Sequence, residues 1–254
     1  MIEINNVSFS FDHVVLKDIN INIEKGKFYT ILGSNGSGKT TLLRILSKAL
    51  QFEKGEILID GKELIQIKPK MLAKEMAVVP QSTEVEFEFS VQDIVLMGRT
   101  PHISRFCSES EKDMKIAMKA MKMTNTWELR NKSINALSGG EKQRVVVARA
   151  IAQETGIILL DEPISHLDIH HQIEIMNQLK QLNKTKNITI IAVLHDLNIA
   201  AAYGDHMILM HDRGIYKDGT PEEVLTEDII KQVYGLEVYI TKNPKTKKTF
   251  IMPF

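Results

Sequence analysis

The chain has 254 residues, and its 32 lysines and arginines are balanced by 32 aspartates and glutamates. This length allows a substantial core and an inserted subdomain. A net charge of zero lacks the basic excess that marks nucleic-acid-binding proteins, so we expect no nucleic-acid partner.

The single cysteine, Cys107, excludes a disulfide within the chain and favours a cytosolic setting. Residues 1–4 lack the basic start and apolar core of a signal peptide. The longest apolar runs, such as residues 188–194, fall far short of the roughly 20 residues that span a bilayer. We therefore expect a chain that does not cross a membrane by itself, which leaves open whether it docks on a partner that does.

The first strands are predicted from alternation of apolar and polar residues. Residues 2–9 alternate, and Ile19, Ile21 and Ile23 do so again. Residues 56–62 predict another strand that enters an Asp60-Gly61 turn. These segments predict an antiparallel sheet beside the core of the fold.

A glycine-rich loop follows the apolar run 28–32 and precedes an amphipathic helix at 42–46. The loop matches the pattern G-x-x-x-x-G-K-[ST] that cradles phosphates. Its candidate nucleotide-binding residues are Gly33, Ser34, Asn35, Gly36, Ser37, Gly38, Lys39, Thr40 and Thr41. Glycines let backbone N–H groups approach phosphate oxygens, and the helix start adds partial positive charge. Lys39 would lie beside the β- and γ-phosphates, and the Thr40 hydroxyl would bind Mg²⁺. The alternative is a glycine-rich turn that only caps a helix.

The types of residue change after the short strand predicted at residues 76–79. From about residue 91 to residue 153 helix-forming residues dominate and strand signals vanish. Met114, Ala117, Met118 and Met121 recur at helical spacing. They indicate either core packing or a methionine-rich surface that grips a partner helix.

Strands and helices then alternate to the end of the chain. Residues 157–160, 188–194 and 207–210 are apolar runs typical of central parallel strands. Ile169, Ile173, Met176, Leu179 and Leu182 lie on one predicted helix face. This alternation predicts a parallel sheet with helices on both faces. Lys242, Lys245, Lys247 and Lys248 predict a solvated C-terminal tail.

Two adjacent carboxylates follow the strand at 157–160, at the end of a strand where sites in such sheets lie. We expect Asp161 to hold Mg²⁺, through water, and Glu162 to polarise the water that attacks the γ-phosphate. An exposed acidic turn is the alternative.

A second phosphate-binding site is predicted at residues 137–141, Leu-Ser-Gly-Gly-Glu, before a helical stretch. Ser138 and Glu141 form a capping box. Gly139 and Gly140 would be poor choices for capping alone, because each costs up to about 1 kcal/mol relative to alanine. They suit a phosphate that approaches the bare backbone of a helix start.

Residues 33–41, 137–141 and 160–163 together resemble the ATP-binding subunit of ABC transporters. The resemblance covers about residues 1–240. It implies an α/β fold: a P-loop NTPase core with a mainly parallel sheet and flanking helices, an N-terminal antiparallel β subdomain and an inserted α-helical subdomain. It implies one ABC ATPase domain over 1–254, with the core at 1–85 and 154–240, the helical subdomain at 86–153 and a tail at 241–254.

The resemblance also implies an ATPase that forms head-to-tail homodimers around ATP and Mg²⁺. Each ATP would lie between the glycine loop of one copy and residues Ser138, Gly139, Gly140 and Glu141 of the other. Gln81 matches a glutamine that touches Mg²⁺, and His195 a histidine that contacts the γ-phosphate. Asp168 matches the aspartate of the D-loop, near the dimer interface, whereas His166 departs from the commoner alanine. Phe11 occupies the place of an aromatic residue that stacks on adenine. His170 and His171 point to different faces of a helix, so we expect no metal site there.

Residues 97–102 and 196–203 are similar to the subgroup that serves bacterial importers of iron–siderophores, haem and vitamin B12. Partners would be a second copy, membrane permease subunits and, indirectly, a substrate-binding protein outside the cytoplasm. The location would be the cytoplasmic face of the cell membrane. Manganese or zinc importers, a soluble non-transport ABC ATPase and a kinase-like phosphotransferase are the alternatives.

Overall fold

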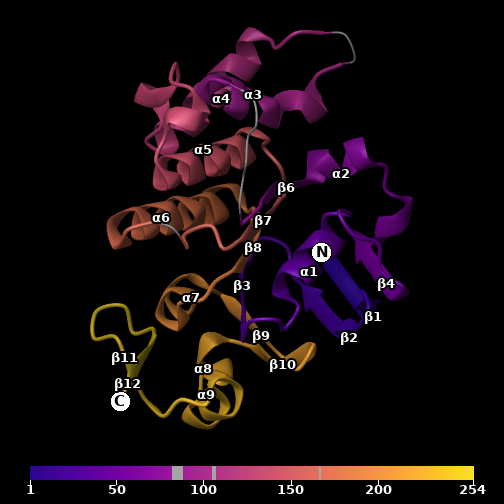
Figure 1. The fold of residues 1–254 in the computed structure, drawn as a ribbon, viewed down its shortest axis with the longest axis vertical. Coiled ribbons are helices and arrows are strands. Elements are labelled where there is room, and N and C mark those ends of the chain that lie inside the picture. The colour runs from indigo at the N-terminus through magenta and orange to yellow at the C-terminus, as the bar shows by residue number, and fades with distance from the viewer. Residues whose placement is uncertain (82–87, 105–106, 166) are drawn as a thin grey trace. The chain divides into compact units, whose positions relative to one another are not determined.

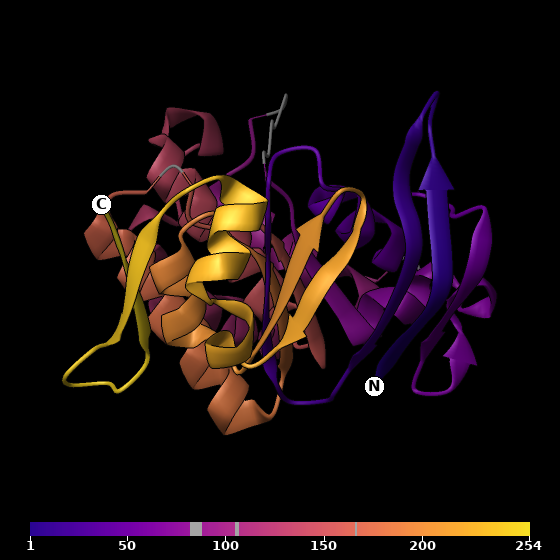
Figure 2. The same cartoon turned by 90° about the horizontal axis from the view of Figure 1, so that it is seen from below.

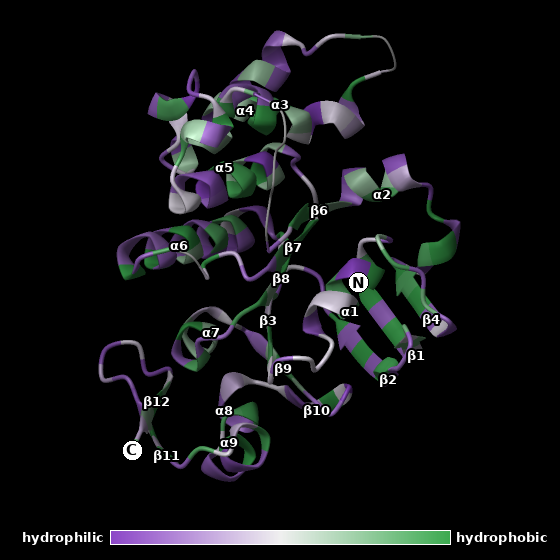
Figure 3. Ribbon diagram, viewed as in Figure 1, coloured by the Kyte–Doolittle hydropathy of each residue, from purple (hydrophilic) through white to green (hydrophobic). Residues whose placement is uncertain are grey.

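The alternating residues near the N-terminus form an antiparallel sheet, as predicted. Strand β1 (Ile2–Ser10) pairs with β2 (Val14–Ile23) and with β4 (Lys54–Ile59), and β5 (Lys62–Glu63) completes this sheet at the Asp60-Gly61 turn. Ile2 and Ile4 on β1 are buried, and the alternation is visible as green and purple bands along β1 and β2 in Figure 3. The computed structural model describes residues 1–81, 88–104, 107–165 and 167–254.

Contacts along the chain divide it into two units, residues 1–68 with 189–254 and residues 69–188. In the first unit, β3 (Phe28–Gly33) is buried at every residue and runs parallel to β8 (Thr189–Val193) and β9 (His206–His211). Strand β10 (Gly214–Gly219) is antiparallel to β9. Helices α1 (Lys39–Leu46), α7 (Leu197–Tyr203), α8 (Pro221–Val224) and α9 (Glu227–Tyr234), with the short helix η1 (Leu64–Gln66), complete this unit (Figure 1).

The last residues are not a tail. Strands β11 (Val238–Lys242) and β12 (Thr249–Pro253) form an antiparallel hairpin, which Figure 2 shows in yellow beside α9. Thr249 and Ile251 are buried, and Asn198 on α7 binds both backbone groups of Ile251 at 2.7 and 3.1 Å. The prediction for residues 241–254 is therefore wrong. The lysines between the strands are polar, but the flanking residues alternate and bury one face of the hairpin.

The second unit begins with α2 (Pro69–Glu75), continues in β6 (Met76–Val79) and ends with α6 (Ile169–Lys186). Strand β7 (Ile157–Asp161) runs parallel to β6 and is buried throughout. Between β6 and β7 lie α3 (Val91–Leu96), α4 (Glu111–Met123) and α5 (Gly139–Ala152), joined by the short helices η2 (Met97–His102), η3 (Trp127–Leu129) and η4 (Ile134–Ala136).

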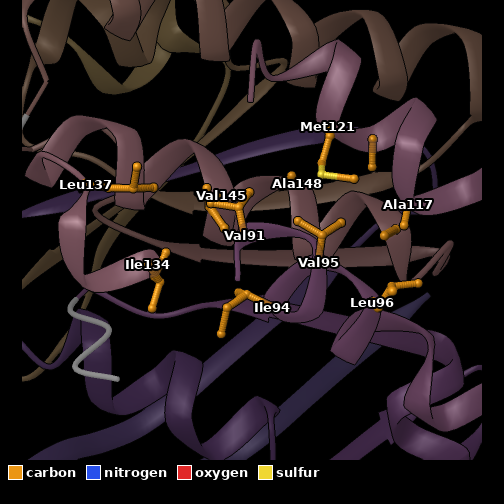
Figure 4. Packing of buried hydrophobic residues seen from close by; sticks show 12 residues of the cluster. Val91, Ile94, Val95, Leu96, Ala117, Met121, Ile134, Leu137, Val145 and Ala148 are labelled. Carbon is orange, nitrogen blue, oxygen red and sulfur yellow. The ribbon is translucent and has the colours of Figure 1, made fainter. Parts of the chain in front are cut away.

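Helices α3, α4 and α5 share a hydrophobic cluster of their own, which Figure 4 shows around Val95 and Val145. Ala117 and Met121 belong to it, whereas Met114 is exposed, so the predicted methionine stripe lies partly in the core and partly at its edge. The alternation of strands and helices gives the mixed α/β fold predicted from the sequence. The predicted subdomain boundaries, 86 and 153, stay a prediction, because the second unit also takes in β6, β7 and α6.

Helix α6 differs from its prediction at its start. Met176, Leu179 and Leu182 are buried as expected, but Ile169 is 76% exposed and Ile173 is exposed as well. Among the described residues, no helix is both long and apolar enough to cross a membrane.

Candidate functional site

The glycine loop between β3 and α1 has a backbone that other residues could not follow. Gly33, Gly36 and Gly38 have φ angles of +146°, +78° and +98°. A Cβ on Gly33 would lie 2.1 Å from the carbonyl oxygen of Met210, and one on Gly38 would lie 2.4 Å from a methyl group of Leu16. The loop therefore needs glycine for conformation and for space. Gly38 is also the N-cap of α1, so the loop leads directly into a helix start.

Polar groups of the loop are positioned for an anion. The Lys39 ammonium is buried and donates to the carbonyl oxygens of Gly33 and Ser34, both at 2.9 Å. The Ser37 hydroxyl is buried and has no hydrogen-bond partner among the described residues. A buried hydroxyl of this kind is costly unless a ligand binds it. Asn35 lies in the loop, and Thr40 and Thr41 lie in the first turn of α1.

His195 and Phe11 belong to the same unit as this loop. Strand β8 pairs with β3 in parallel, and the Leu194 N–H donates to Ile31 O at 3.1 Å, so the parallel register continues past the strand. Gly33, the last residue of β3, and His195, two residues after the end of β8, therefore lie at the same end of the sheet. Phe11 is 58% exposed, and its ring packs edge-on against Phe9 with 4.7 Å between centroids. An exposed aromatic ring held by a neighbour suits stacking on a flat ligand.

One residue beside the loop was missed by the sequence analysis. The Tyr234 hydroxyl, at the end of α9, makes a hydrogen bond with the Gly33 backbone. Burial raises the pKa of Tyr234 to about 12 although this hydrogen bond acts in the opposite direction. The phenol therefore stays protonated beside the loop. Nothing in the local sequence links two residues this far apart.

The carboxylates after β7 lie in the second unit. Asp161 is buried at the end of the strand. Glu162 has a left-handed backbone, with φ +51°, a conformation that costs a non-glycine residue about 1 kcal/mol or more. The Gln81 amide donates to Glu162 Oε2 at 2.8 Å. The structure thus brings together Gln81 and Glu162, two predicted site residues that are far apart in the sequence. Their hydrogen bond orients the carboxylate of Glu162, the predicted base.

Residues 138–141 form the start of α5 and a complete capping box. The Ser138 N–H and hydroxyl both donate to Glu141 Oε2 at 2.8 Å, and the Glu141 N–H donates to the Ser138 hydroxyl at 3.3 Å. The backbone hydrogen bond from Ser138 is the largest cause of the lowered pKa of Glu141. A Cβ on Gly139 would meet nothing within 4 Å, whereas one on Gly140 would approach Leu167 at 3.0 Å. Packing within the chain therefore does not require glycine at residue 139, which leaves its backbone open to a ligand.

Asp168 is the N-cap of α6. One carboxylate oxygen accepts from the His171 N–H at 3.0 Å, and the other lies 2.7 Å from His171 Nδ1. These hydrogen bonds, the backbone one first, lower the pKa of Asp168. His166, which precedes this segment by two residues, lies outside the described residues. The hydrogen bonds between His171 and Asp168 were not predicted, although an aspartate followed three residues later by a histidine is a usable signal for such a pair.

The glycine loop fits the phosphates of ATP, because it offers a lysine and an unsatisfied buried hydroxyl to phosphate oxygens. In the first unit Thr40 offers a hydroxyl oxygen. In the second unit Gln81 and Asp161 offer an amide and a carboxylate oxygen. Oxygen ligands of these kinds are the ones that Mg²⁺ prefers. Within the described ranges, no group of three or more His, Cys, Asp or Glu residues could hold a metal ion by itself.

Comparison with known proteins gives consistent matches over most of the chain. Residues 16–165 match the family described as ABC transporter. The chain is 40% identical to the iron(3+)-hydroxamate import ATP-binding protein FhuC of Bacillus subtilis, over 96% of this chain and 90% of that protein. It is similar in structure to a metal-chelate type ABC transporter in an inward-facing conformation, with a TM-score of 0.86, 29% identity and coverage of 100% and 97% of the two chains. A dimeric ATP-binding cassette in a post-hydrolysis state, bound to ADP and phosphate, matches with a TM-score of 0.78 and 30% identity, over 87% of this chain and 99% of that chain.

Proposed function

Because the chain belongs to the ABC transporter family, we propose that it is the ATP-hydrolysing subunit of an importer for iron–siderophore, haem or cobalamin-type cargo. The observation that supports ATPase activity is the hydrogen bond between Gln81 and Glu162, in a chain that also has the glycine loop. Glu162 directly follows the buried Asp161. The cargo class rests on similarity to an import protein for iron(3+)-hydroxamate and to a metal-chelate type transporter.

The glycine loop binds the phosphates of ATP in this proposal. Lys39, which now donates to carbonyl oxygens of the loop, donates to the β- and γ-phosphates, and the Ser37 hydroxyl gains the partner that it lacks. Phe11 stacks on the adenine. Thr40, Gln81 and Asp161 are the residues that would hold Mg²⁺, and the ion would supply positive charge against the negative charge of the phosphates.

Glu162 accepts the proton of the attacking water. Its hydrogen bond to Gln81 holds one carboxylate oxygen, so the orientation of the base depends on Gln81. His195 contacts the γ-phosphate. These are positioning and proton-transfer roles, and a positioned base of this kind typically contributes 10²–10⁴-fold to the rate.

A second copy completes the site. Residues 138–141 of that copy face the γ-phosphate, where the helix start and the bare backbone of Gly139 favour an anion. The dimer docks on membrane permease subunits at the cytoplasmic face of the cell membrane, and a substrate-binding protein delivers the cargo to the permease. Hydrolysis then drives uptake.

Glu162→Gln tests the catalytic role. We expect ATP affinity to be kept, hydrolysis to slow at least about 10²-fold, and a stable ATP-bound dimer to accumulate. Phosphate release and light scattering after size-exclusion chromatography measure these. Glu222→Gln, an exposed glutamate on α8, is the matched control. Hydrolysis by Glu162→Gln at the rate of the control would show that Glu162 is not the base.

Gly139→Arg tests the contribution of the second copy. A Cβ at residue 139 would meet nothing within 4 Å among the described residues, and the Ser138–Glu141 capping box is kept. We expect ATP binding by the monomer to be unchanged and dimer formation to be blocked. Loss of monomer affinity instead would mean that this segment does not act on a second copy.

A further inference from the structure

Ile164, Leu167 and Asp168, which precede α6, accept hydrogen bonds from two consecutive residues of that helix. The Gln172 amide donates to the carbonyl oxygens of Ile164 and Leu167, at 3.1 and 3.0 Å. His171 takes both carboxylate oxygens of Asp168, one through its backbone N–H and one through Nδ1. Ser165 bonds back to Glu162 O through its N–H at 3.4 Å and its hydroxyl at 3.2 Å.

The ring of His171 makes a second hydrogen bond to Asp168, and helix capping does not need this second bond. Asp196, the N-cap of α7, uses one carboxylate oxygen for the N–H groups of Asn198 and Ile199, at 2.8 and 2.9 Å. Asp168 caps α6 with one oxygen as well, but its second oxygen binds the imidazole of His171. Because an ionised carboxylate only accepts hydrogen bonds, Nδ1 of His171 carries the proton.

The hydrogen bond between the His171 ring and Asp168 is suited to fixing the orientation of the Asp168 carboxylate rather than to stabilising the fold. The side chain of Asp168 is 64% exposed and that of His171 is 37% exposed, and exposed pairs of this kind add little to stability. The contact does remove the rotational freedom of the Asp168 carboxylate. A fixed carboxylate on the surface matters where another molecule must meet it in one orientation.

We propose that His171 is a positioning residue for ATP hydrolysis. Its ring fixes the Asp168 carboxylate, while Gln172 holds the carbonyl groups of Ile164 and Leu167. A second copy of this chain would meet the Asp168 carboxylate on closure. The inference rests on the proposed function, which supplies the dimer. Since Ser165, three residues before Asp168, bonds back to Glu162 O, a misplaced Asp168 carboxylate weakens closure and slows the step that Glu162 performs.

Substitutions that mimic one ring nitrogen at a time test the proposal. An asparagine amide places a donor near the position of Nδ1, whereas a glutamine amide places it near Nε2. We expect kcat for ATP to fall about tenfold or more in His171→Gln and His171→Leu, and to stay within about threefold of the wild-type value in His171→Asn. The KM for ATP and the melting temperature stay unchanged, because the backbone N–H of residue 171 still caps with Asp168. His170→Gln, at the exposed neighbouring histidine, is the matched control.

The same variants in the Glu162→Gln background report on closure directly. We expect the ATP-dependent dimer to dissociate at about tenfold higher concentration in His171→Gln than in His171→Asn, as measured by sedimentation. Equal kcat and equal dimer affinity for His171→Gln, His171→Asn and wild type would overturn the inference while leaving the proposed function in place. Failure of the Glu162→Gln parent to dimerise with ATP would overturn the proposed function and the inference with it.

Discussion

Substitution of Arg99 tests how much buried hydrogen bonds and ion pairs stabilise the helical part of the chain. Its side chain is only 5% exposed, and it donates to Asp113 at 2.9 Å, to the carbonyl oxygen of Ala152 at 2.7 Å and to Glu154 at 3.1 Å. It therefore joins η2, α4 and the end of α5. Arg99→Met keeps most of the volume and removes every one of these hydrogen bonds.

The contacts of Arg99 set the loss of stability that we expect in Arg99→Met. Removal of one partner from a buried ion pair costs about 3–5 kcal/mol, because the other charge stays buried. Asp113 still accepts two hydrogen bonds from Ser110, one donated by the Ser110 N–H at 3.0 Å and one by the Ser110 hydroxyl at 2.6 Å. We therefore expect the low end, about 3 kcal/mol, which corresponds to a fall of about 6–12 °C in melting temperature for a chain of this size.

The pH dependence gives an independent signature. The pKa of Asp113 is lowered from 3.8 to about 2, first by the Ser110 hydroxyl and next by Arg99. A lowered pKa in the folded state means that the carboxylate stabilises the fold above pH 3.8, and that this stabilisation is lost as the pH falls towards about 2. The difference between wild type and Arg99→Met should narrow over that same window.

Urea denaturation of wild type, Arg99→Met, Asp113→Asn and the double variant measures the interaction. Lys231→Met is the control, because its exposed pair with Glu237 should contribute less than about 1 kcal/mol. A coupling free energy between Arg99 and Asp113 of less than about 0.5 kcal/mol would refute this account.

Three further predictions follow from single contacts. Gly98→Ala would place a Cβ 2.3 Å from the carbonyl oxygen of Arg149, so we expect a loss of about 1–3 kcal/mol by urea denaturation, and none in Gly156→Ala, where a Cβ meets nothing within 4 Å. Asn198→Ala leaves the N–H and carbonyl of Ile251 without this partner, so stability should fall by about 1–3 kcal/mol and proteolysis near residues 243–248 should speed up; an unchanged cleavage rate would contradict it. Ile169→Asp should change stability by less than about 0.5 kcal/mol because the side chain is exposed, yet weaken the ATP-dependent dimer; equal dimer affinity would show that this turn of α6 lies outside the contact.

Most of the candidate site could be picked out from the sequence because it lies in short continuous segments. The glycine loop, Ser138–Glu141 and Asp161–Glu162 each combine residue types whose spacing has a direct geometric meaning. The strands β1, β3 and β7 could be predicted for the same reason, since alternation or continuous apolarity reports burial on one or both faces. The resemblance to a known family predicts a role for isolated residues such as Gln81 and His195.

Other features depend on which distant segments meet. The hairpin of residues 238–253 was missed because four nearby lysines dominate its composition, although its inward face is buried and bonded to Asn198. Ile169 fits the apolar stripe of α6 but lies beyond the part of the helix that is covered. A periodic pattern predicts which face a residue lies on, and not how far along the helix the covering neighbours extend.

The sequence by itself therefore determined the kind of fold, the glycine loop and the pair of carboxylates after β7, because local spacing controls local backbone geometry. Only the tertiary structure decided that Gln81 holds Glu162, that Tyr234 meets Gly33 and that His171 fixes Asp168. The first two are contacts between residues far apart in the chain, and the third depends on the rotamer that the start of α6 allows. Such contacts follow from packing and hydrogen-bond satisfaction across the whole fold, which no local pattern records.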